Sequence, residues 1–426
     1  MKIKSFLIET KYVERDSFIW NMAGSMLMAF QSVIMLMILT RVLGLKEAGI
    51  FTIAYANANL FLTIGKYGMR NFQVSDVRGQ FSFPEYGISR VLTSAVMLIV
   101  SIGYVWYIGN KNAYSLDKSL VIIWMCVFKM VDAAEDVYHA MYQQKGRLDI
   151  AGKAMTLRLA VTILFFGIGL IVTRNLLIIL IASTLLTALL FVLFTKYSND
   201  GFEQPGGKDV SGREVIRLLK ICFPLFLGTF LSFYIGNAPK YAIDSILSDE
   251  LQACYGFIAM PVFVIGLLNG FVFNPMVARM SLMWNQGKIK RFVKLFLGQM
   301  LVIILITGVC MTGAYLIGVP VLSAMYNTDL TPYKTELLIL LLGGGFLAFS
   351  GLQVTIITII RFQKSLAWGY MIVAALAYIL SPVLVERYSM FGATVLYLGL
   401  MLMLCVIFGI LLVYGIVTGM GKKEVS

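Results

Sequence analysis

The sequence predicts an all-α polytopic membrane protein with about twelve transmembrane helices arranged as two six-helix lobes. Of its 426 residues, 59% are hydrophobic and only 13% are charged, which is too apolar for a soluble domain of this length. Apolar segments of roughly 17–25 residues, the length that crosses a bilayer as a helix, recur about twelve times. The loops between them alternate between rich and poor in lysine and arginine, a pattern typical of membrane helices.

The predicted spans follow one another with mostly short loops between them. They lie at Ser17–Thr40, Ala48–Met69, Val91–Gly109, Leu120–Gln143, Leu157–Val172, Asn175–Thr195, Ile221–Leu247, Ala253–Pro275, Leu295–Gly318, Leu337–Ile360, Leu366–Leu384 and Gly392–Val417. Because only Thr173 and Arg174 separate the fifth span from the sixth, these two helices must form a hairpin. On the side opposite the termini, Val319–Glu336 is the longest predicted loop.

The distribution of lysine and arginine predicts the orientation. Loops on the side of the N-terminus carry roughly 26 of these residues, against roughly 8 on the other side. The basic loops include Lys145–Arg158, Lys196–Lys220 and Arg279–Lys294. The positive-inside rule therefore predicts that both termini are cytoplasmic. Since the cations lie in short alternating loops, we interpret the net charge of +13 as topology control and contact with anionic lipid, and exclude a nucleic-acid partner.

A polar stretch near the midpoint divides the chain. It contains Ser198-Asn-Asp-Gly201 and Pro205-Gly-Gly207, which is typical of a flexible linker. We therefore expect an N-terminal lobe over residues 1–200, a cytoplasmic linker over 201–217 and a C-terminal lobe over 218–426. Two lobes of similar size are the plan of many secondary transporters.

Several classes of function are excluded by what the chain contains. The five cysteines fall in apolar segments without a CxxC pair, and the chain has a single histidine, so we expect no disulfide framework, no metal site and no catalytic triad. Gly343-Gly-Gly345 lacks the phosphate-loop pattern and instead predicts close helix packing or a kink. We expect no enzyme activity and no cofactor.

The fourth predicted span carries the strongest candidate site. Its members are Lys129, Asp132, Glu135, Asp136 and His139. At about 100° per residue they share roughly a third of the helix circumference. Ionised groups cost several kcal/mol each in lipid, so this face must contact water, a partner charge or a ligand.

Three interpretations of this stripe remain open, the simplest being that its cytoplasmic end leaves the membrane as a solvated helix that continues to Gln144. The functional one is a substrate or proton path, in which a carboxylate or His139 changes charge during transport, coupled to protons or sodium ions. The structural one is internal pairing, of Lys129 with Asp132 and of Glu135 with His139.

A second set of charges lies near the ends of other spans. Arg41 follows the first span, Lys66 lies near the inner end of the second, and Lys240 and Asp244 lie late in the seventh. Pro239 can kink or end that helix. The cations can extend to the membrane surface, or, together with Lys129, bind an anionic headgroup such as a phosphate. We take Arg41, Lys66, Lys129 and Lys240 as substrate-binding candidates, and Asp132, Glu135, Asp136, His139 and Asp244 as ion-coupling candidates.

Several stretches resemble a known family. They are Phe18-Ile-Trp-Asn-Met-Ala-Gly-Ser25, Thr40-Arg-Val-Leu-Gly44, Gly49-Ile-Phe-Thr-Ile-Ala54, Asp136-Val-Tyr-His-Ala-Met-Tyr-Gln-Gln-Lys-Gly146, and Asn237-Ala-Pro-Lys-Tyr-Ala-Ile-Asp244 with Tyr255-Gly256. The chain resembles Wzx-type polysaccharide repeat-unit flippases, the lipopolysaccharide and capsule exporters of the multidrug/oligosaccharidyl-lipid/polysaccharide superfamily. The resemblance extends over essentially the whole chain in length, topology and two-lobe plan.

The resemblance implies a V-shaped, MATE-like pair of six-helix bundles around a cationic cavity. Such proteins move undecaprenyl-diphosphate-linked oligosaccharides across the bacterial cytoplasmic membrane, from the inner to the outer leaflet, together with other polysaccharide-assembly proteins. Arg41 and Lys240 match the cations that close the first helix of each lobe. The main alternative is a cation-coupled multidrug exporter of the same superfamily, which would favour an acidic cavity. A membrane glycan polymerase or ligase is a third alternative, but the predicted external loops are too small and too weakly charged for such an enzyme.

Overall fold

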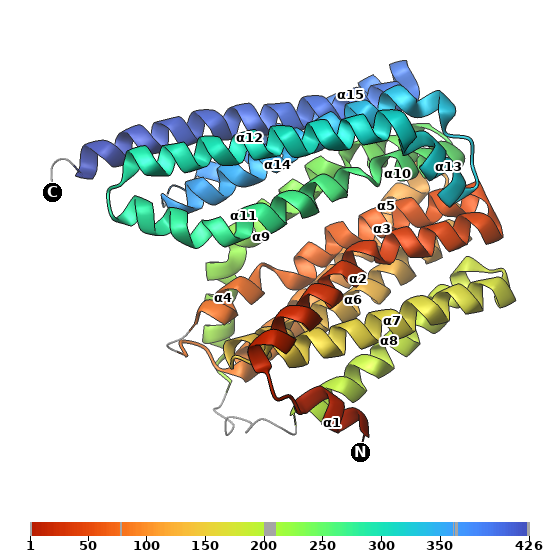
Figure 1. Ribbon diagram of the computed structural model, residues 1–426. Coiled ribbons are helices and arrows are strands. Elements are labelled where there is room, and N and C mark those ends of the chain that lie inside the picture. Colours follow the sequence, from red (N-terminus) through yellow and green to blue (C-terminus); the bar gives the residue numbers. More distant parts are fainter. Residues whose placement is uncertain (1, 77–78, 200–209, 361, 363–364, 424–426) are drawn as a thin grey trace. The chain divides into compact units, whose positions relative to one another are not determined.

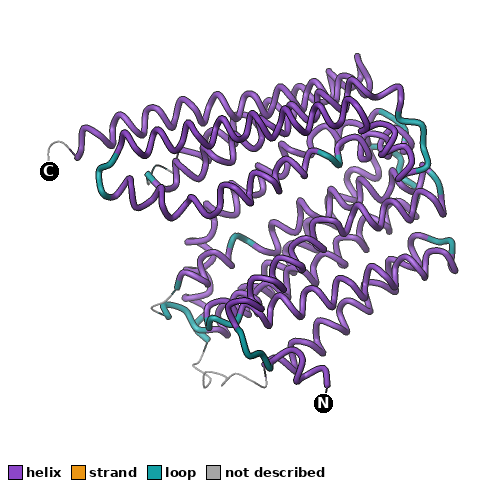
Figure 2. Tube along the Cα trace, viewed as in Figure 1, coloured by secondary structure: helices purple, strands orange, loops and turns teal. Residues whose placement is uncertain are grey.

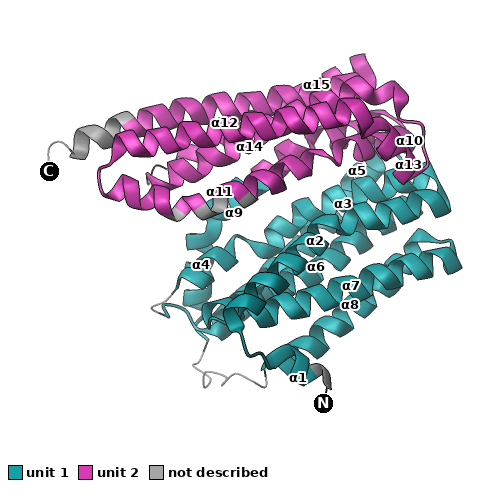
Figure 3. Ribbon diagram, viewed as in Figure 1, with its two compact units in different colours: residues 1–230 teal, residues 231–426 magenta. Residues whose placement is uncertain are grey.

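The computed structural model describes residues 2–76, 79–199, 210–360, 362 and 365–423. All regular elements in this part of the chain are helices (Figures 1 and 2), which confirms the predicted all-α class. The residues divide into two compact units, Met1–Phe230 and Leu231–Ser426 (Figure 3).

Unit 1 is built from long helices joined by short turns. Its elements are α1 (Lys2–Ile8), α2 (Val13–Leu43), α3 (Leu45–Lys66), α4 (Met69–Ser75), α5 (Phe83–Lys111), α6 (Leu116–Gln144), α7 (Leu148–Thr173), α8 (Leu176–Asn199) and the first part of α9 (Gly212–Ile246). Gly44, at φ +89°, forms the one-residue turn between α2 and α3, a conformation that favours glycine. The predicted hairpin at Arg174 is confirmed, since α7 ends at Thr173, Arg174 adopts a left-handed conformation, and α8 begins at Leu176 and packs against α7.

The central helix of unit 1 is α6, which packs against α3, α4, α5, α7 and α8. The residue before it, Ser115, is its N-cap: the Ser115 side chain accepts a hydrogen bond from the Lys118 amide at 3.2 Å. Beside it, α2 and α7 approach closely at two glycines. A Cβ atom built on Gly152 would lie 2.6 Å from the Asn21 nitrogen, and one on Gly24 would lie 2.5 Å from the Met155 methyl.

Unit 2 contains the remaining elements. They are the end of α9, α10 (Asp249–Ala259), α11 (Val262–Asn285), α12 (Ile289–Gly313), the π-helix η1 (Ala314–Gly318), α13 (Val319–Tyr326), the 3₁₀ turn η2 (Thr331–Tyr333), α14 (Lys334–Ile359) and α15 (Leu366–Lys423). The central helix is α14, which contacts α10, α11, α12 and α15.

Three consecutive glycines allow α14 to occupy this central place. A Cβ atom on Gly343 would lie 2.7 Å from the Tyr397 ring of α15, one on Gly344 2.9 Å from Val262 of α11, and one on Gly345 2.8 Å from Thr307 of α12. Side chains at these positions would push three neighbouring helices apart. The close packing predicted for this triplet is confirmed.

The element α15 is a hairpin of two helices. Its 58 residues would form a helix of about 87 Å, nearly three times the hydrocarbon thickness of about 30 Å. Ser389 has non-helical dihedrals, φ 50° and ψ −131°, and a Cβ atom on Gly392 would lie 2.0 Å from the Leu384 carbonyl oxygen. The rings of Tyr370 and Phe408 meet at 4.9 Å, so the two arms run antiparallel and cross the membrane separately.

These observations support the predicted number of spans. In the described part of the chain, ten helical segments are long and apolar enough to cross a membrane. The count omits α6 because its charged residues lower its hydropathy, although its 29 residues are enough to cross a bilayer. The count also treats α15 as a single span. With α6 and the second arm of α15 included, the described residues contain twelve helical segments long enough to cross a membrane.

The seventh predicted span, Ile221–Leu247, lies almost wholly within α9, which continues past Pro239 to Ile246. Three details of the predicted elements are wrong. The eighth predicted span is two helices, α10 and α11, since Pro261 has no amide hydrogen to continue the ladder. The predicted loop Val319–Glu336 contains α13, an apolar segment that ends at Asn327 in a left-handed conformation. Finally, α7 begins at Leu148 and not near Leu157.

With α7 beginning this early, two cations of the predicted loop Lys145–Arg158, Arg147 and Lys153, contact other parts of unit 1. Arg147 donates to the Ile8 carbonyl at 2.6 Å and pairs with Asp149 at 2.9 Å, and that carboxylate raises the pKa of the Arg147 guanidinium. Lys153 donates to the Phe6 carbonyl at 3.0 Å. These contacts hold α1 against α7, so part of the basic stretch is structural.

The predicted linker is only partly described. Residues 200–209 lie outside the described residues, while α9 begins at Gly212, within the proposed linker. The division of the chain at residues 201–217 stays a prediction.

Candidate functional site

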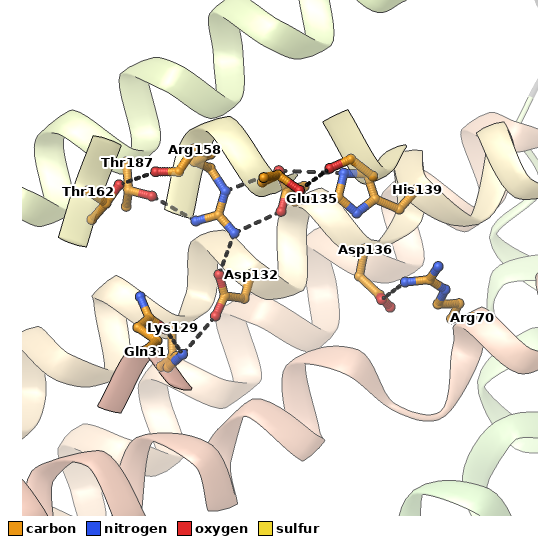
Figure 4. A network of polar contacts seen from close by, with 12 residues as sticks. Gln31, Arg70, Lys129, Asp132, Glu135, Asp136, His139, Arg158, Thr162 and Thr187 are labelled. Carbon is orange, nitrogen blue, oxygen red and sulfur yellow. Dashed lines mark hydrogen bonds and ion pairs between the residues drawn. The ribbon is translucent and has the colours of Figure 1, made fainter. Parts of the chain in front are cut away.

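A buried network of charged side chains runs through unit 1, with α6 at its centre (Figure 4). The five predicted stripe residues, Lys129, Asp132, Glu135, Asp136 and His139, are between 2% and 5% exposed. They contact side chains that α2, α4, α5 and α7 supply, and Arg158 of α7 extends the network to α8. The stripe therefore lies inside the helix bundle, as its cost in lipid requires.

Arg158 of α7 forms the centre of the network (Figure 4) and is fully buried. Its guanidinium donates to Glu135 Oε1 at 3.0 Å and Oε2 at 2.8 Å, to Asp132 Oδ1 at 2.7 Å and to the Thr187 hydroxyl of α8 at 2.7 Å. A planar guanidinium can make such paired contacts, whereas an ammonium cannot. One side chain thus joins α6, α7 and α8.

Lys129 joins the same network to α2. Its ammonium donates to Asp132 Oδ2 at 3.0 Å and to Gln31 Oε1 at 2.8 Å, and lies 4.7 Å from the centre of the Tyr55 ring. The predicted pair of Lys129 with Asp132 is therefore present. Asp132 is held by two cations, one on each carboxylate oxygen.

Asp136 is also bound by two cations. Arg90 of α5 donates to its Oδ2 at 3.0 Å, and Arg70 of α4 to its Oδ1 at 3.3 Å. Arg90 also donates to the Gly65 carbonyl near the end of α3. Lys66, the last residue of α3, is partly buried and within electrostatic range of Asp132 and Asp136.

His139 is the most weakly held member. Its Nε2 lies 3.5 Å from Glu135 Oε1, one turn earlier on α6, the pairing predicted from the i, i+4 spacing. Glu135 already accepts two hydrogen bonds from Arg158, so it has a strong partner whether or not His139 is charged.

Within the described residues, each of the three stripe carboxylates has at least one cationic partner. Lys129, Arg158 and Arg90 are fully buried and balance Asp132, Glu135 and Asp136 in charge. A proton or sodium ion binding here would compete with an existing ion pair. The ion-coupling roles of these residues stay predictions, and no group of three or more potential metal ligands occurs in the described part of the chain.

Arg158 and Arg90 are the two fully enclosed arginines of the network that the sequence did not reveal. Both lie at the predicted edge of a span, Arg158 at the end of a basic stretch and Arg90 directly before Val91. For Arg158, the apolar neighbours Ala154, Met155 and Val161 would have been the available signal, because they place this arginine inside a helix that continues past the hydropathy boundary. The corresponding neighbours of Arg90 include glycine, threonine and serine and give no such signal.

Unit 2 holds a cavity of about 690 Å³ with a different character. It lies between α9, α10, α11, α12, α14 and α15, and its walls are mostly apolar and aromatic. Lys240 is the only charged side chain among the described residues that line it. In the described part of the chain, Lys240 has no hydrogen bond or ion pair with another side chain.

The other predicted site residues lie apart from this cavity lining. Arg41 is exposed at the end of α2, and Asp244 is partly buried on α9, one turn beyond Lys240. The structure therefore brings Lys129 into a paired network and Lys240 into a cavity. Arg41 and Lys66 lie at helix ends, and their substrate-binding roles stay predictions.

Comparison with solved structures identifies the fold. A lipid II flippase, MurJ in an inward closed conformation, superposes with a TM-score of 0.69 at 14% identity, over 90% of this chain and 86% of that one. An inward-facing multidrug resistance MATE family transporter of the MOP superfamily gives 0.67 at 12% identity, over 93% and 96%. A MOP superfamily transporter from Pyrococcus furiosus, described as having a binding pocket of reverse polarity, gives 0.59 at 14% identity, over 99% of each chain.

No protein-family profile matches the chain. No curated protein matches it either. At these low identities the structural similarity defines the fold alone. The chain is a multi-pass membrane protein with the fold of MOP superfamily transporters, a fold shared by lipid flippases and multidrug exporters, and its neighbours are transporters and not enzymes.

Proposed function

We propose that this protein is a flippase for lipid-linked oligosaccharides. Its substrate is an undecaprenyl-diphosphate-linked repeat unit, moved from the inner to the outer leaflet of a bacterial cytoplasmic membrane for polysaccharide assembly. Both termini are cytoplasmic in this proposal, as the distribution of lysine and arginine predicts. A diphosphate cannot cross about 30 Å of hydrocarbon unaided, so a protein must supply the polar path.

The observation that carries this proposal is the charge of the unit 2 cavity. A cation-coupled exporter of cationic drugs needs carboxylates free to bind a cation, but the stripe carboxylates of unit 1 are already paired with arginine and lysine. In the cavity, the charged group is Lys240. An unpaired ammonium in an apolar cavity favours an anion, and a phosphate is a strong partner for it.

Transport proceeds by alternating access in this proposal, the mechanism of two-lobe secondary transporters. The ion-pair network makes the packing of unit 1 specific, since separating α5 or α7 from α6 would leave a buried charge unpaired. This unit would then move as a rigid body. The similarity to a lipid II flippase supports a lipid-linked substrate, and the multidrug exporters of the same fold define the rival function.

The experiment is to delete the gene and measure the lipid-linked oligosaccharide that accumulates in the cytoplasmic leaflet. We expect accumulation that wild type reverses and that Lys240→Gln does not. Lys290→Gln, an exposed lysine at the start of α12, is the matched control and should restore transport fully. Normal surface glycan without accumulation, together with increased sensitivity to cationic drugs, would show that the drug exporter is the correct assignment.

A further inference from the structure

The cavity of unit 2 is elongated along the helices that form it. On α14 its lining extends from Leu340 to Leu352, and on α9 from Ser232 to Lys240. At 1.5 Å per residue these stretches correspond to about 18 Å and about 12 Å. The cavity therefore extends along roughly half of the hydrocarbon thickness of about 30 Å, which is the shape required for a chain-like ligand.

The charge lies at one end of this cavity. Lys240 is the last lining residue of α9, where α10 and the first turn of α11 contribute Tyr255 and Val262. The rest of the wall is mainly aromatic and aliphatic: Phe233, Phe263, Phe273, Ile303, Leu340 and Leu347. Two amides, Asn269 and Gln299, interrupt it, and the Asn269 amide nitrogen already donates to the Ile265 carbonyl at 2.8 Å. A ligand with an anionic head and an apolar chain matches this arrangement.

The volume limits how much of a ligand can enter. A cavity of about 690 Å³ is in the range of roughly 300–1,000 Å³ that holds one small molecule. An oligosaccharide and a complete polyprenyl chain cannot both fit. A phosphate group with the first few isoprene units can.

We propose that this cavity binds the carrier part of the substrate, with Lys240 on its phosphate and the first isoprene units along the apolar wall. This inference rests on the proposed flippase function and orientation. In that orientation the Lys240 end of the cavity is near the outer leaflet, and the apolar part extends toward the membrane centre. A lipid of the outer leaflet has the same polarity, so the cavity holds the carrier after translocation. Recognition here is of the isoprenyl phosphate and not of the glycan.

Glycines in the wall provide a clean test. Gly266 of α11 lines the cavity, and a Cβ atom built on it has nothing within 4 Å. The Cβ of a leucine at this position would therefore lie in open space, with the rest of the side chain on the cavity side of α11, and leucine is a better helix former than glycine. Gly298→Leu is the matched control, because Gly298 of α12 is exposed, also has open space around it and does not line the cavity.

The experiment measures binding of farnesyl diphosphate to the purified full-length protein, with inorganic diphosphate and farnesol as partial ligands. We expect farnesyl diphosphate to bind wild type and the Gly298→Leu variant equally, and Gly266→Leu to abolish binding. Lys240→Gln should weaken binding by about tenfold or more, the effect of losing one charge-assisted contact. Farnesol should bind weakly and without dependence on Lys240. Binding that neither Gly266→Leu nor Lys240→Gln changes, or an absence of binding to wild type, would overturn the inference.

Failure of this inference can be distinguished from failure of the proposed function. If deletion of the gene causes accumulation of lipid-linked oligosaccharide, and Gly266→Leu and Lys240→Gln both restore transport and bind farnesyl diphosphate normally, the flippase assignment stands and the carrier site is not this cavity. If deletion causes no accumulation, the function itself is wrong. Size-exclusion profiles and melting temperatures of all variants show whether each is folded.

Discussion

Replacing Arg158 with methionine should destabilise unit 1 more than any other single loss of charge in the network. The side chain is fully buried, and methionine occupies a similar volume but supplies none of the four hydrogen bonds to Glu135, Asp132 and Thr187. Asp132 keeps its contact with Lys129 at 3.0 Å. Glu135 keeps only His139 at 3.5 Å, so a nearly unpaired carboxylate remains inside the bundle.

The expected cost is about 3–5 kcal/mol of unfolding free energy, the usual penalty for breaking a buried ion pair by removing one partner. Reversible unfolding in mixed micelles by SDS, followed by circular dichroism, measures it. Arg217→Met is the matched control. Arg217 pairs with Glu214 at 3.1 Å but is 59% exposed, so its loss should cost less than about 1 kcal/mol.

A second substitution tests the physical reason. If the penalty comes from the stranded carboxylate, Arg158→Met combined with Glu135→Gln should be less destabilising than the sum of the two single changes, by about 0.5–3 kcal/mol. A cost below about 1 kcal/mol for Arg158→Met, or strict additivity of the pair, would refute the interpretation of this network as a structural clamp.

Three further predictions concern the same unit and use the same unfolding assay. Gly152→Leu should destabilise unit 1 by at least about 1–3 kcal/mol, because the Asn21 backbone nitrogen lies 2.6 Å from the added Cβ. Gly103→Leu is the control and should have no such effect, because Gly103 has open space around it. Equal behaviour of the two variants would be inconsistent with a close crossing of α2 and α7. Lys129→Met should cost less than Arg158→Met, since Asp132 keeps Arg158 as a partner; the reverse order would contradict the network. Ser115→Ala should cost about 0.5–2 kcal/mol by removing the cap of α6, and an unchanged midpoint would argue against that cap.

The fold could be predicted because membrane crossing imposes simple rules on the sequence. Apolar segment length, the Arg174 hairpin and the glycine triplet of α14 are local features, and each has the expected consequence. Helix ends were predicted less well. The charged ends of α5 and α7 are buried by partners elsewhere in the fold, such as Asp136 for Arg90 and Glu135 for Arg158, and hydropathy contains no information about these partners.

The candidate site was predictable only in part, for the same reason. The stripe on α6 is conspicuous because five polar residues interrupt an apolar segment at helical spacing. Whether they line a cavity or pair internally depends on Arg158, Arg90 and Arg70, which come from three other helices. The cavity at Lys240 depends on side-chain volumes across six helices, and such packing cannot be read from one segment at a time.

The central claim is that this chain moves an anionic isoprenyl-linked glycan across a membrane. Its most direct test is a leaflet assay in vesicles that contain the purified protein and a lipid-linked oligosaccharide in both leaflets. A membrane-impermeant glycan-modifying reagent is added outside the vesicles. We predict that with wild type the reagent also modifies the oligosaccharide that began in the inner leaflet, because the protein moves it to the outer leaflet. With Lys240→Gln that fraction should stay unmodified. Protection of that fraction in vesicles with wild type, while the same vesicles transport a cationic dye, would contradict the account.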